Sequence, residues 1–362
     1  MTQPMGQIIK MVEPGTVALQ SYEVPDPGPG EVLLRMVRAN VCGSELHYWA
    51  GRNPQVRAGC LGHEGIGRVE ALGQGVATDN AGSPLSPGDL VTFTYFVVCQ
   101  RCPSCRRGLF HLCENGYQWW RKQPEESPHF HATFATHYLV HRDQHVYRVP
   151  TGISDYVAAS ANCAVAQMLF GLDTVDPRPG DVLVIQGLGG LGLYAVAMAK
   201  HRAARVVAVD LVEGRLDLAQ RFGADVVVNR AKESDENLRD AVNALSGGYG
   251  ADAVIDVTGV PESLTSGLAL AHPGGQVLEI GNVSPGRVAE LDPGALTRRA
   301  VRLQFLIRYP PWYLHKALAF LAETAHQFPY AALESASYSL DEVQAALDHS
   351  ARREVVRASI VM

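Results

Sequence analysis

Hydrophobic residues between positions 181 and 307 fall into short runs that alternate with helix-compatible segments. Runs of this length suit buried strands, and the intervening segments contain few helix breakers. The predicted strands are 182–185, 206–209, 226–228, 253–257, 275–280 and 301–307, and the predicted helices are 194–200, 213–222, 236–245 and 261–271. Strands and helices that alternate in this way predict a parallel, doubly wound α/β sheet.

The first 150 residues have a different pattern, in which short β-type runs such as 31–36 and 90–93 are separated by turn signals. Pro27-Gly28-Pro29-Gly30 and Pro87-Gly88-Asp89 are two of these signals. Many short strands between Gly- and Pro-rich turns predict an all-β, barrel-like domain.

The ends of the α/β region set the expected domain limits. Segments 156–172 and 313–328 are predicted to be helical, and 355–361 is predicted to be a strand. We therefore expect a β domain at 1–164 that is completed by 307–362, with an α/β domain at 165–306 inserted between its two parts.

A glycine-rich turn follows the first α/β strand. Gly187-Leu188-Gly189-Gly190-Leu191-Gly192 stands between the apolar run 182–185 and a predicted helix, and the next strand ends in Asp210. Strand, helix, second strand and terminal acid all occur within about thirty residues, as the dinucleotide-binding fingerprint requires. Such a turn packs its helix closely and leaves helix N–H groups for a pyrophosphate. The predicted cofactor-binding residues are Gly187, Gly189, Gly190, Leu191, Gly192, Asp210 and Arg215.

Composition narrows the class of protein. The chain has 362 residues, of which 47% are hydrophobic and 19% charged, as in globular domains with sizeable cores. A net charge of −6 argues against a general nucleic-acid or anionic-membrane binder. No apolar run approaches the ~20 residues that span a bilayer, and no secretory signal is recognised, so a cytoplasmic location is expected.

Four of the seven cysteines lie close together, within the segment 95–115. Cys99, Cys102, Cys105 and Cys113 form a C-x₂-C-x₂-C-x₇-C lobe, whose short spacings let four thiolates surround one ion. Four sulfurs leave no open position for a substrate, so a structural zinc is expected. An iron–sulfur cluster and a nucleic-acid-binding zinc ribbon are the alternatives.

A second set of possible metal ligands lies outside this lobe. Cys42, His63 and Cys163 supply soft and borderline ligands, and a catalytic zinc needs about three protein ligands and one open position. Each of these residues alone is more often a core or surface residue. The hypothesis therefore depends on their combination with the glycine turn.

These motifs together resemble the zinc-dependent medium-chain alcohol dehydrogenases along essentially the whole chain. The motifs that carry the resemblance are CGSELHYW (42–49), LGHEGIGRVEALG (61–73), the four-cysteine lobe, GLGGLG (187–192) and Asp210. The first two look most similar to the polyol and threonine dehydrogenase branch. The resemblance implies a GroES-like catalytic domain with an inserted Rossmann domain, and oxidation of alcohols or reduction of carbonyls with a nicotinamide cofactor.

The resemblance also implies residue roles. Cys42, His63 and Cys163 would hold the catalytic zinc, with Glu64 as a nearby carboxylate. Ser44 would take the hydroxyl proton and pass it through the cofactor ribose to His47, whose unperturbed pKa lies near neutrality. Arg357 resembles the arginine that contacts the pyrophosphate. The polyol branch commonly has glutamate where this chain has Cys163, which puts polyol specificity in doubt.

The cofactor and the substrate class are predicted from particular residues. Asp210 favours NAD over NADP, because a carboxylate at this strand end binds the ribose 2′-OH and repels a 2′-phosphate. Tyr48, Trp49, Tyr95 and Trp119 are the predicted substrate-lining residues, and an aromatic pocket suits a bulky or cyclic secondary alcohol. A polyol or amino-alcohol dehydrogenase and a non-enzymatic nucleotide-binding scaffold are the alternatives. His129, His131 and Arg308 have no assigned role, and a homodimer or homotetramer is expected.

Overall fold

The computed structural model describes residues 4–52 and 58–362. The chain divides into two compact units, of which unit 1 comprises Met1–Gln167 and Arg308–Met362 and unit 2 comprises Met168–Ile307. The domain limits expected from the sequence differ from these by one to three residues. Each unit is described by itself below.

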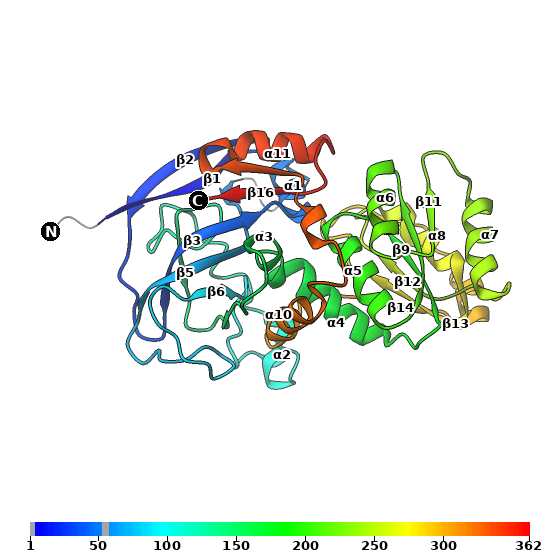
Figure 1. Cartoon of the computed structure of the whole chain (residues 1–362), viewed down its shortest axis with the longest axis horizontal. Coiled ribbons are helices and arrows are strands. Elements are labelled where there is room, and N and C mark those ends of the chain that lie inside the picture. The colour runs from blue at the N-terminus through cyan, green and yellow to red at the C-terminus, as the bar shows by residue number, and fades with distance from the viewer. Residues whose placement is uncertain (1–3, 53–57) are drawn as a thin grey trace. The chain divides into compact units, whose positions relative to one another are not determined.

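Unit 1 is built on two β-sheets, which are coloured mainly blue, cyan and red in Figure 1. The smaller sheet has the strand order β2-β1-β4, and the larger has the order β15-β16-β3-β5-β6-β8 with β7 paired to β3. Their bounds are β1 Met5–Glu13, β2 Thr16–Glu23, β3 Val32–Asn40, β4 Gly59–Cys60, β5 Glu64–Leu72, β6 Leu90–Phe93, β7 His137–Val140, β8 Val146–Arg148, β15 Ala336–Ser339 and β16 Ala358–Val361. The C-terminal segment therefore completes the sheet begun by the N-terminal one, since β16 pairs antiparallel with β3.

Short helices close the edges of unit 1. They are α1 Gly43–Trp49, α2 Pro103–Arg106, η1 Phe110–Leu112, α3 Asp155–Ala158, η2 Ala161–Val165, α10 Tyr313–Thr324, η3 Tyr330–Leu333, η4 Leu340–Glu342 and α11 Val343–Ala351. Helices α1 and α11 pack with β1, β3 and β16 around one hydrophobic core, which includes Trp49, Ile360 and Leu347. A second core fills the space between β3, β5, β6, β7 and β8, where Phe93 and Leu34 are fully buried.

Unit 2 is a single sheet of six parallel strands in the order β11-β10-β9-β12-β13-β14 (Figure 1). The strands are β9 Val182–Gln186, β10 Arg205–Asp210, β11 Val226–Asn229, β12 Ala251–Asp256, β13 Ala271–Glu279 and β14 Arg302–Phe305. The helices are α4 Ala166–Val175, which begins at the last residues of unit 1, α5 Gly190–His201, α6 Glu213–Arg221, α7 Asp235–Ser246, α8 Pro261–Leu270 and α9 Pro293–Arg299. The predicted doubly wound sheet is confirmed.

The order of the strands explains why β9 and β12 are so apolar. They are central strands with neighbours on both sides, and their residues Val184, Val254 and Ile255 are fully buried. A parallel strand with helices over both faces has no solvated side, so it is hydrophobic along its whole length. Successive strands are added on one side of β9 as far as β11 and on its other side from β12 onward, so the strand order reverses between β9 and β12. Such sheets bind ligands at this switch point, at the carboxyl ends of the strands.

The segment 156–172 differs from its prediction as a single helix. It contains α3, then a π-helical turn at η2, and only then the regular helix α4. The sequence has no Gly or Pro between Tyr156 and Phe170 and does not reveal a wide turn, because the wide turn changes hydrogen bonding and not composition. The helices α1, α9 and α11 were also not predicted from the sequence.

In the part of the chain that the structure describes, helices are too short or too polar to cross a membrane.

Candidate metal centres and nucleotide-binding turn

Four buried side chains from three distant segments meet in unit 1. Cys42 precedes α1, His63 and Glu64 stand at the start of β5, and Cys163 lies in the π-turn η2. One ligand atom from each of these residues lies within 4.8 Å of all the others. The structure thus brings together the three predicted catalytic-zinc ligands and the predicted nearby carboxylate. We call these four residues the mixed metal group.

The donor atoms of the mixed metal group suit zinc. The Cys163 Sγ atom lies 4.0 Å from Cys42 Sγ and 3.2 Å from His63 Nε2. Two thiolates and one imidazole are a typical donor set for a catalytic zinc that keeps its fourth position open. Hydrogen bonding with Cys163 lowers the pKa of the Cys42 thiol, which favours the thiolate form that binds metals.

Glu45 is a functional residue that the sequence analysis missed. Its Oε1 atom lies 2.5 Å from His63 Nδ1, and its Oε2 atom accepts a hydrogen bond of 2.6 Å from the Cys42 backbone N–H. Burial lowers the pKa of the His63 imidazole, but the Glu45 carboxylate and the Cys42 thiolate raise it more, to about 10. A carboxylate that holds the Nδ1–H leaves Nε2 free for a metal. The signal was present, because Glu45 stands three residues after Cys42, where a capping box places a glutamate.

Glu64 and Arg357 form a buried ion pair beside the same group. The Arg357 Nη2 atom contacts Glu64 Oε2, and the Arg357 residue is only 4% exposed. The charge of Cys42 also acts on Arg357. Isolated buried charges are costly, so this arginine balances the carboxylate next to the thiols. The sequence had pointed only to a pyrophosphate contact for Arg357, and the pairing with Glu64 was not foreseen.

Asn162 and Tyr309 hold the π-turn in place, and neither was predicted. The Asn162 Nδ2 atom donates to the backbone carbonyls of His63, at 2.9 Å, and Phe93, at 3.0 Å. The Tyr309 hydroxyl donates to the carbonyl of Asn162. These bonds tie η2 to the strands beside it, and so they fix Cys163 relative to His63.

The predicted proton-relay residues lie on α1. Ser44 and His47 are half-buried and three residues apart, so they share one face of this helix. Helix α1 begins directly after Cys42, the first predicted metal ligand. Ser44 and His47 therefore stand on the helix that starts at this ligand.

Aromatic side chains line one side of the mixed metal group. The Tyr95 ring lies 4.9 Å from the His63 ring, and Tyr117 stacks on Tyr95 at 6.5 Å. Trp120 lies 6.3 Å from Tyr117 and 5.4 Å from Tyr48. We call Tyr48, Tyr95, Tyr117 and Trp120 the aromatic wall.

Two of the predicted substrate-lining residues do not belong to this wall. Trp49 lies in the hydrophobic core around α11. Trp119 lies in a third core, separate from the two described above, with its Nε1–H donated to the Leu139 carbonyl at 3.1 Å. Adjacent residues point in different directions, and only Trp120 of the pair 119–120 packs on Tyr117. We therefore assign Trp49 and Trp119 to the core.

The two histidines without an assigned role have structural partners. His129 stacks on Tyr22 with ring centroids 4.3 Å apart, and its Nδ1 atom lies 2.8 Å from the Pro124 carbonyl. His131 is fully buried, with Nε2 3.3 Å from the Gln123 carbonyl, and burial lowers its pKa to about 4. A neutral, buried imidazole bonded to a carbonyl stabilises the loop that carries it.

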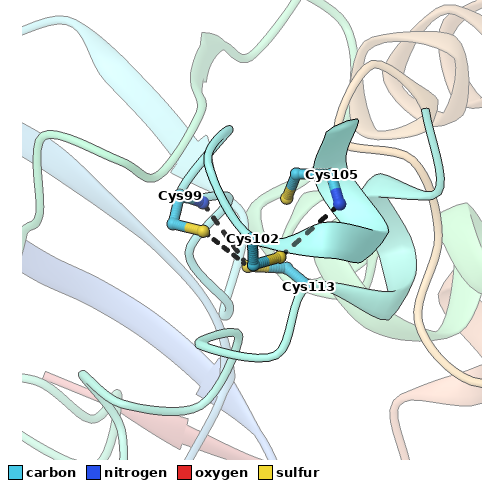
Figure 2. A group of neighbouring side chains, drawn as sticks. All are labelled: Cys99, Cys102, Cys105 and Cys113. Carbon is cyan, nitrogen blue, oxygen red and sulfur yellow. Dashed lines mark hydrogen bonds between the residues drawn. The ribbon is translucent and has the colours of Figure 1, made fainter. Parts of the chain in front are cut away.

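The four-cysteine lobe forms the second group, which Figure 2 shows with all four side chains converging. The ligand atoms of Cys99, Cys102, Cys105 and Cys113 lie within 4.8 Å of one another, and all four residues are buried. The Cys105 N–H points at Cys102 Sγ from 3.5 Å, and the Cys99 N–H points at Cys113 Sγ from 3.4 Å. Four sulfurs that converge without a disulfide fit a closed tetrahedral zinc site.

Asn115 supports the lobe from outside. Its Nδ2 atom lies 3.3 Å from Cys99 Sγ. Burial raises the pKa of the Cys99 thiol, but this amide and the backbone N–H groups of Arg101 and Cys102 outweigh it and lower the pKa to about 6. N–H donors around the sulfurs favour thiolates, which are the metal-binding form.

The glycine turn in unit 2 has the geometry that its motif predicts. Gly187 has φ +92°, and a Cβ on Gly192 would lie 1.8 Å from the Gly187 carbonyl oxygen, so no side chain fits at position 192. A Cβ on Gly189 would meet nothing within 4 Å. Packing within the chain therefore does not explain Gly189, whereas the approach of a ligand to the start of α5 does. Gly190 and Leu191 form the first turn of that helix.

Asp210 closes the same turn at the end of β10. Its Oδ2 atom accepts from the Leu188 N–H at 2.7 Å, and its Oδ1 atom accepts from the N–H groups of Leu211, at 2.7 Å, and Val212, at 3.0 Å. The Arg215 Nη1 atom lies 3.8 Å from Asp210 Oδ2. The carboxylate is therefore held in one place, next to the glycine turn and beside Arg215.

Comparison with known proteins agrees with both units. The family model described as "Alcohol dehydrogenase GroES-like domain" matches residues 28–151, and that described as "Zinc-binding dehydrogenase" matches residues 190–323. The chain is 31% identical to 5-exo-hydroxycamphor dehydrogenase of Pseudomonas putida, over 93% of each chain. It is 32% identical to L-threonine 3-dehydrogenase of Pyrococcus furiosus, over 80% of this chain and 79% of the relative.

A solved structure gives the same result. The crystal structure of an alcohol dehydrogenase from Thermotoga maritima superposes with a TM-score of 0.91 at 26% identity, and 99% of each chain is covered. The fold is thus a GroES-like domain together with a Rossmann domain, and the activity is that of an alcohol oxidoreductase. The chain belongs to the zinc-dependent medium-chain alcohol dehydrogenase family.

Proposed function

We propose that this protein oxidises bulky or cyclic secondary alcohols, or reduces the corresponding ketones, with NAD and a catalytic zinc held by Cys42, His63 and Cys163. The convergence of these three buried donors from distant segments is the observation that carries the proposal. The four-cysteine lobe holds a second, structural zinc. Relatives that are dehydrogenases by name favour an enzyme over a nucleotide-binding scaffold.

Each residue of the site has a defined task in this proposal. When bound, zinc supplies a Lewis acid for the alcohol oxygen and NAD accepts the hydride. Glu45 orients His63 through Nδ1, and Asn162 holds the backbone on which His63 stands. The Ser44 hydroxyl accepts the substrate proton, and the His47 imidazole releases it to solvent, because its unperturbed pKa lies near neutrality.

Residues at the glycine turn favour NAD as the nucleotide. The Asp210 carboxylate is held by three backbone N–H groups and brings a negative charge to the strand end. A negative charge at this position repels the 2′-phosphate of NADP and accepts a hydrogen bond from a free 2′-OH. Arg215 lies beside the carboxylate and flanks the adenosine. The open space at Gly189 lets the pyrophosphate approach the N-terminus of α5, and Arg357 is a further candidate for a pyrophosphate contact.

The aromatic wall supports the proposed substrate class. Four rings, of which Tyr95 contacts His63 and the others follow in contact with one another, offer aromatic area to a bulky ring system, whereas a sugar polyol needs several polar partners. The relative from Pseudomonas putida carries a name that refers to a cyclic alcohol, 5-exo-hydroxycamphor. Cys163 stands where the polyol branch commonly has glutamate.

An amino-alcohol such as threonine is the second candidate substrate. The relative from Pyrococcus furiosus is named for threonine, at an identity similar to that of the camphor relative. Activity on threonine or sorbitol that exceeds activity on cyclic alcohols would favour this alternative.

The proposal is tested by a screen for NADH formation at 340 nm over primary, secondary, cyclic and polyol alcohols, with zinc measured in parallel. We expect cyclic secondary alcohols to give the highest kcat/KM and zinc to be present at two ions per chain. Cys163→Ala should lose the catalytic zinc and the activity. Full activity and full zinc content in this variant would contradict the ligand assignment.

We also propose that the protein is a cytoplasmic homo-oligomer. The seven cysteines are all free, which suits a reducing compartment. Strand β14 forms an edge of the unit 2 sheet. Phe305, its last residue, and Ile307, two residues beyond it, are 65% and 43% exposed. An exposed apolar edge strand is a ready template for pairing with a second copy.

A further inference from the structure

Arg308 is a buried arginine that neither metal group uses directly. It follows β14 in the chain, begins the second segment of unit 1 and has a left-handed backbone conformation with φ 56°. The residue is only 6% exposed. A buried guanidinium is destabilising unless nearby groups compensate its charge, so its surroundings should show what the charge serves.

The guanidinium lies against the four-cysteine lobe and against two rings. Its Nη2 atom donates to the Cys113 carbonyl at 3.2 Å. Its Cζ atom lies 4.7 Å from the centre of the Tyr117 ring and 5.6 Å from the centre of the Phe96 ring. Cations attract aromatic faces at such distances, and more strongly when water is excluded.

The turn between Cys113 and Gly116 is shaped around this side chain. A Cβ on Gly116 would lie 1.5 Å from Arg308 Nη1, so any side chain there would displace the guanidinium. The Gly116 N–H also donates to the Cys113 carbonyl, at 3.0 Å. One carbonyl thus accepts from both the turn and the guanidinium, and a displaced Arg308 would loosen both contacts.

The lobe supplies the charge that compensates Arg308. Among the residues that the structure describes, no carboxylate pairs with Arg308. Zinc with four thiolates carries a net charge of −2, so a loaded lobe is an anionic centre next to a buried cation. A buried charge with a nearby opposite charge and a hydrogen bond repays much of its desolvation cost.

Arg308 also contacts the aromatic wall, through the Tyr117 ring. Tyr117, which lies under the guanidinium, stacks on Tyr95, and Tyr95 packs on the His63 ring. We propose that Arg308 is a positioning residue that ties the four-cysteine lobe to the aromatic wall beside His63. This inference rests on the proposed structural zinc, and it gives the lobe a role in shaping the substrate pocket.

Two consequences follow from this arrangement. Without Arg308, the lobe loses a cation and a hydrogen bond, so it releases its metal faster. The aromatic wall loses the cation under which Tyr117 is placed, so substrate binding weakens while the donor set around the reacting oxygen is unchanged.

The test compares Arg308→Gln with Arg308→Lys and with the control Arg107→Gln, which removes an exposed charge from the same lobe. Metal release is measured with a chromogenic zinc chelator in a Cys163→Ala background, where only the lobe retains zinc. We expect Arg308→Gln to release zinc about tenfold faster, as for the loss of one charged hydrogen bond. Arg308→Lys should restore slow zinc release but not the KM of the parent, because an ammonium keeps the charge but not the planar stacking. The control should behave like the parent.

In the chain with Cys163 restored, Arg308→Gln should raise KM for a cyclic alcohol about tenfold and change kcat less than twofold. Gly116→Ala, which pushes the guanidinium away without removing it, should show the same two effects even where Arg308→Gln folds poorly. Unchanged metal release in both variants would overturn the proposal, whatever happens to KM. A parent chain without lobe zinc would instead contradict the metal assignment itself.

Discussion

A metal-binding histidine must aim one ring nitrogen at the metal, and here one carboxylate orients the ring by holding Nδ1. Glu45 is fully buried, contacts His63 Nδ1 and accepts the Cys42 N–H. One side chain therefore orients two of the three proposed ligands. The same carboxylate caps α1, so the start of the helix and the metal group depend on one residue.

Glu45→Gln should weaken zinc binding at the mixed metal group about 10- to 100-fold, the usual effect of removing a partner of a ligating histidine. Competition with a fluorescent chelator measures the affinity. Glu342→Gln is the matched control, because Glu342 completes a capping box with Ser339 and belongs to neither metal group. Equal zinc affinity in the two variants would show that Glu45 only caps the helix.

Asp210 is the residue that we expect to choose the nucleotide. Asp210→Asn keeps one of the two oxygens that accept from backbone N–H groups and removes the negative charge that repels a 2′-phosphate. The ratio of kcat/KM for NAD to that for NADP should fall about tenfold or more, where each tenfold corresponds to about 1.4 kcal/mol. Asp217→Asn, which removes an exposed charge on α6, should leave this ratio unchanged. A ratio unaffected by Asp210→Asn would remove the basis of the NAD assignment.

Short, irregular elements carry most of the proposed metal ligands. Cys163 stands in a π-turn and Cys42 at a helix start, while the lobe contains only a four-residue helix and a three-residue one. Such elements bury little area, so they depend on bonds such as those of Asn162 and on bound metal. The regular strands supply the rigid frame to which these elements are attached.

The four-cysteine lobe should therefore lose stability together with its metal. Cys105→Ser should reduce zinc from two ions per chain to one and lower the Tm, because ligand binding to the folded state contributes directly to stability. Mass spectrometry under native conditions and thermal unfolding measure the two effects. Cys60→Ser is the control, since Cys60 is buried outside the lobe. Two zinc ions in the Cys105→Ser variant would contradict the lobe as a metal site.

The carboxyl ends of β12 and β13 place two acids side by side. Asp256 and Glu279 are in register on neighbouring strands, and both are buried. The Thr258 and Ser263 hydroxyls and the Thr258 N–H donate to Asp256. Burial, and then the charge of Asp256, raise the pKa of Glu279 to about 7. Between pH 4.5 and about pH 7, the folded state therefore holds a proton on Glu279 that the unfolded chain has already released.

The Asp256–Glu279 pair predicts how the stability of the fold changes with pH. The stability that the Glu279 proton contributes is present below the unfolded pKa of 4.5 and is lost as pH rises through about 7. Glu279→Gln should flatten this fall, so the Tm of the variant should exceed that of the parent by ~2–4 °C at pH 8 and by less at pH 5. Calorimetry at the two pH values measures the difference. A larger gain at pH 5 than at pH 8 would refute the assignment.

At the scale of the whole molecule, each unit has one chemical task. Unit 1 contains both metal groups and the aromatic wall, and unit 2 contains the glycine turn and Asp210. The segment Arg308–Met362 returns to unit 1, where it supplies Arg308, Tyr309 and Arg357. Residues of this segment thus lie at the proposed metal site whose first ligand along the chain is Cys42.

The edge strand β14 is the contact that we expect in the proposed homo-oligomer. Phe305→Lys should shift the protein toward the monomer, because a charged side chain on an exposed edge opposes strand pairing. Light scattering after gel filtration gives the mass. Tyr249→Lys is the control, since Tyr249 is an aromatic residue of similar exposure, 62%, elsewhere in unit 2. An unchanged oligomer with Phe305→Lys would exclude β14 as the contact.

Several features of the protein follow from its sequence alone, because they are local in the chain. The alternation of strands and helices, the glycine turn and the four-cysteine lobe each depend on residues within a few tens of positions of one another. Period, turn chemistry and ligand spacing are properties of short segments, so the sequence shows them directly. The resemblance to a family could be recognised for the same reason.

The side-chain contacts around the metal groups were decided only by the tertiary structure, because they depend on which distant segments meet. Four contacts join segments that lie far apart in the chain: Glu45 with His63, Arg357 with Glu64, Asn162 with the His63 carbonyl, and Arg308 with the lobe. Only the capping role of Glu45 was visible in the local sequence. Trp49 and Trp119 were placed in the pocket by position along the chain, and packing directed them into the cores. A side chain's direction is set by the elements packed around it, and no local pattern records that.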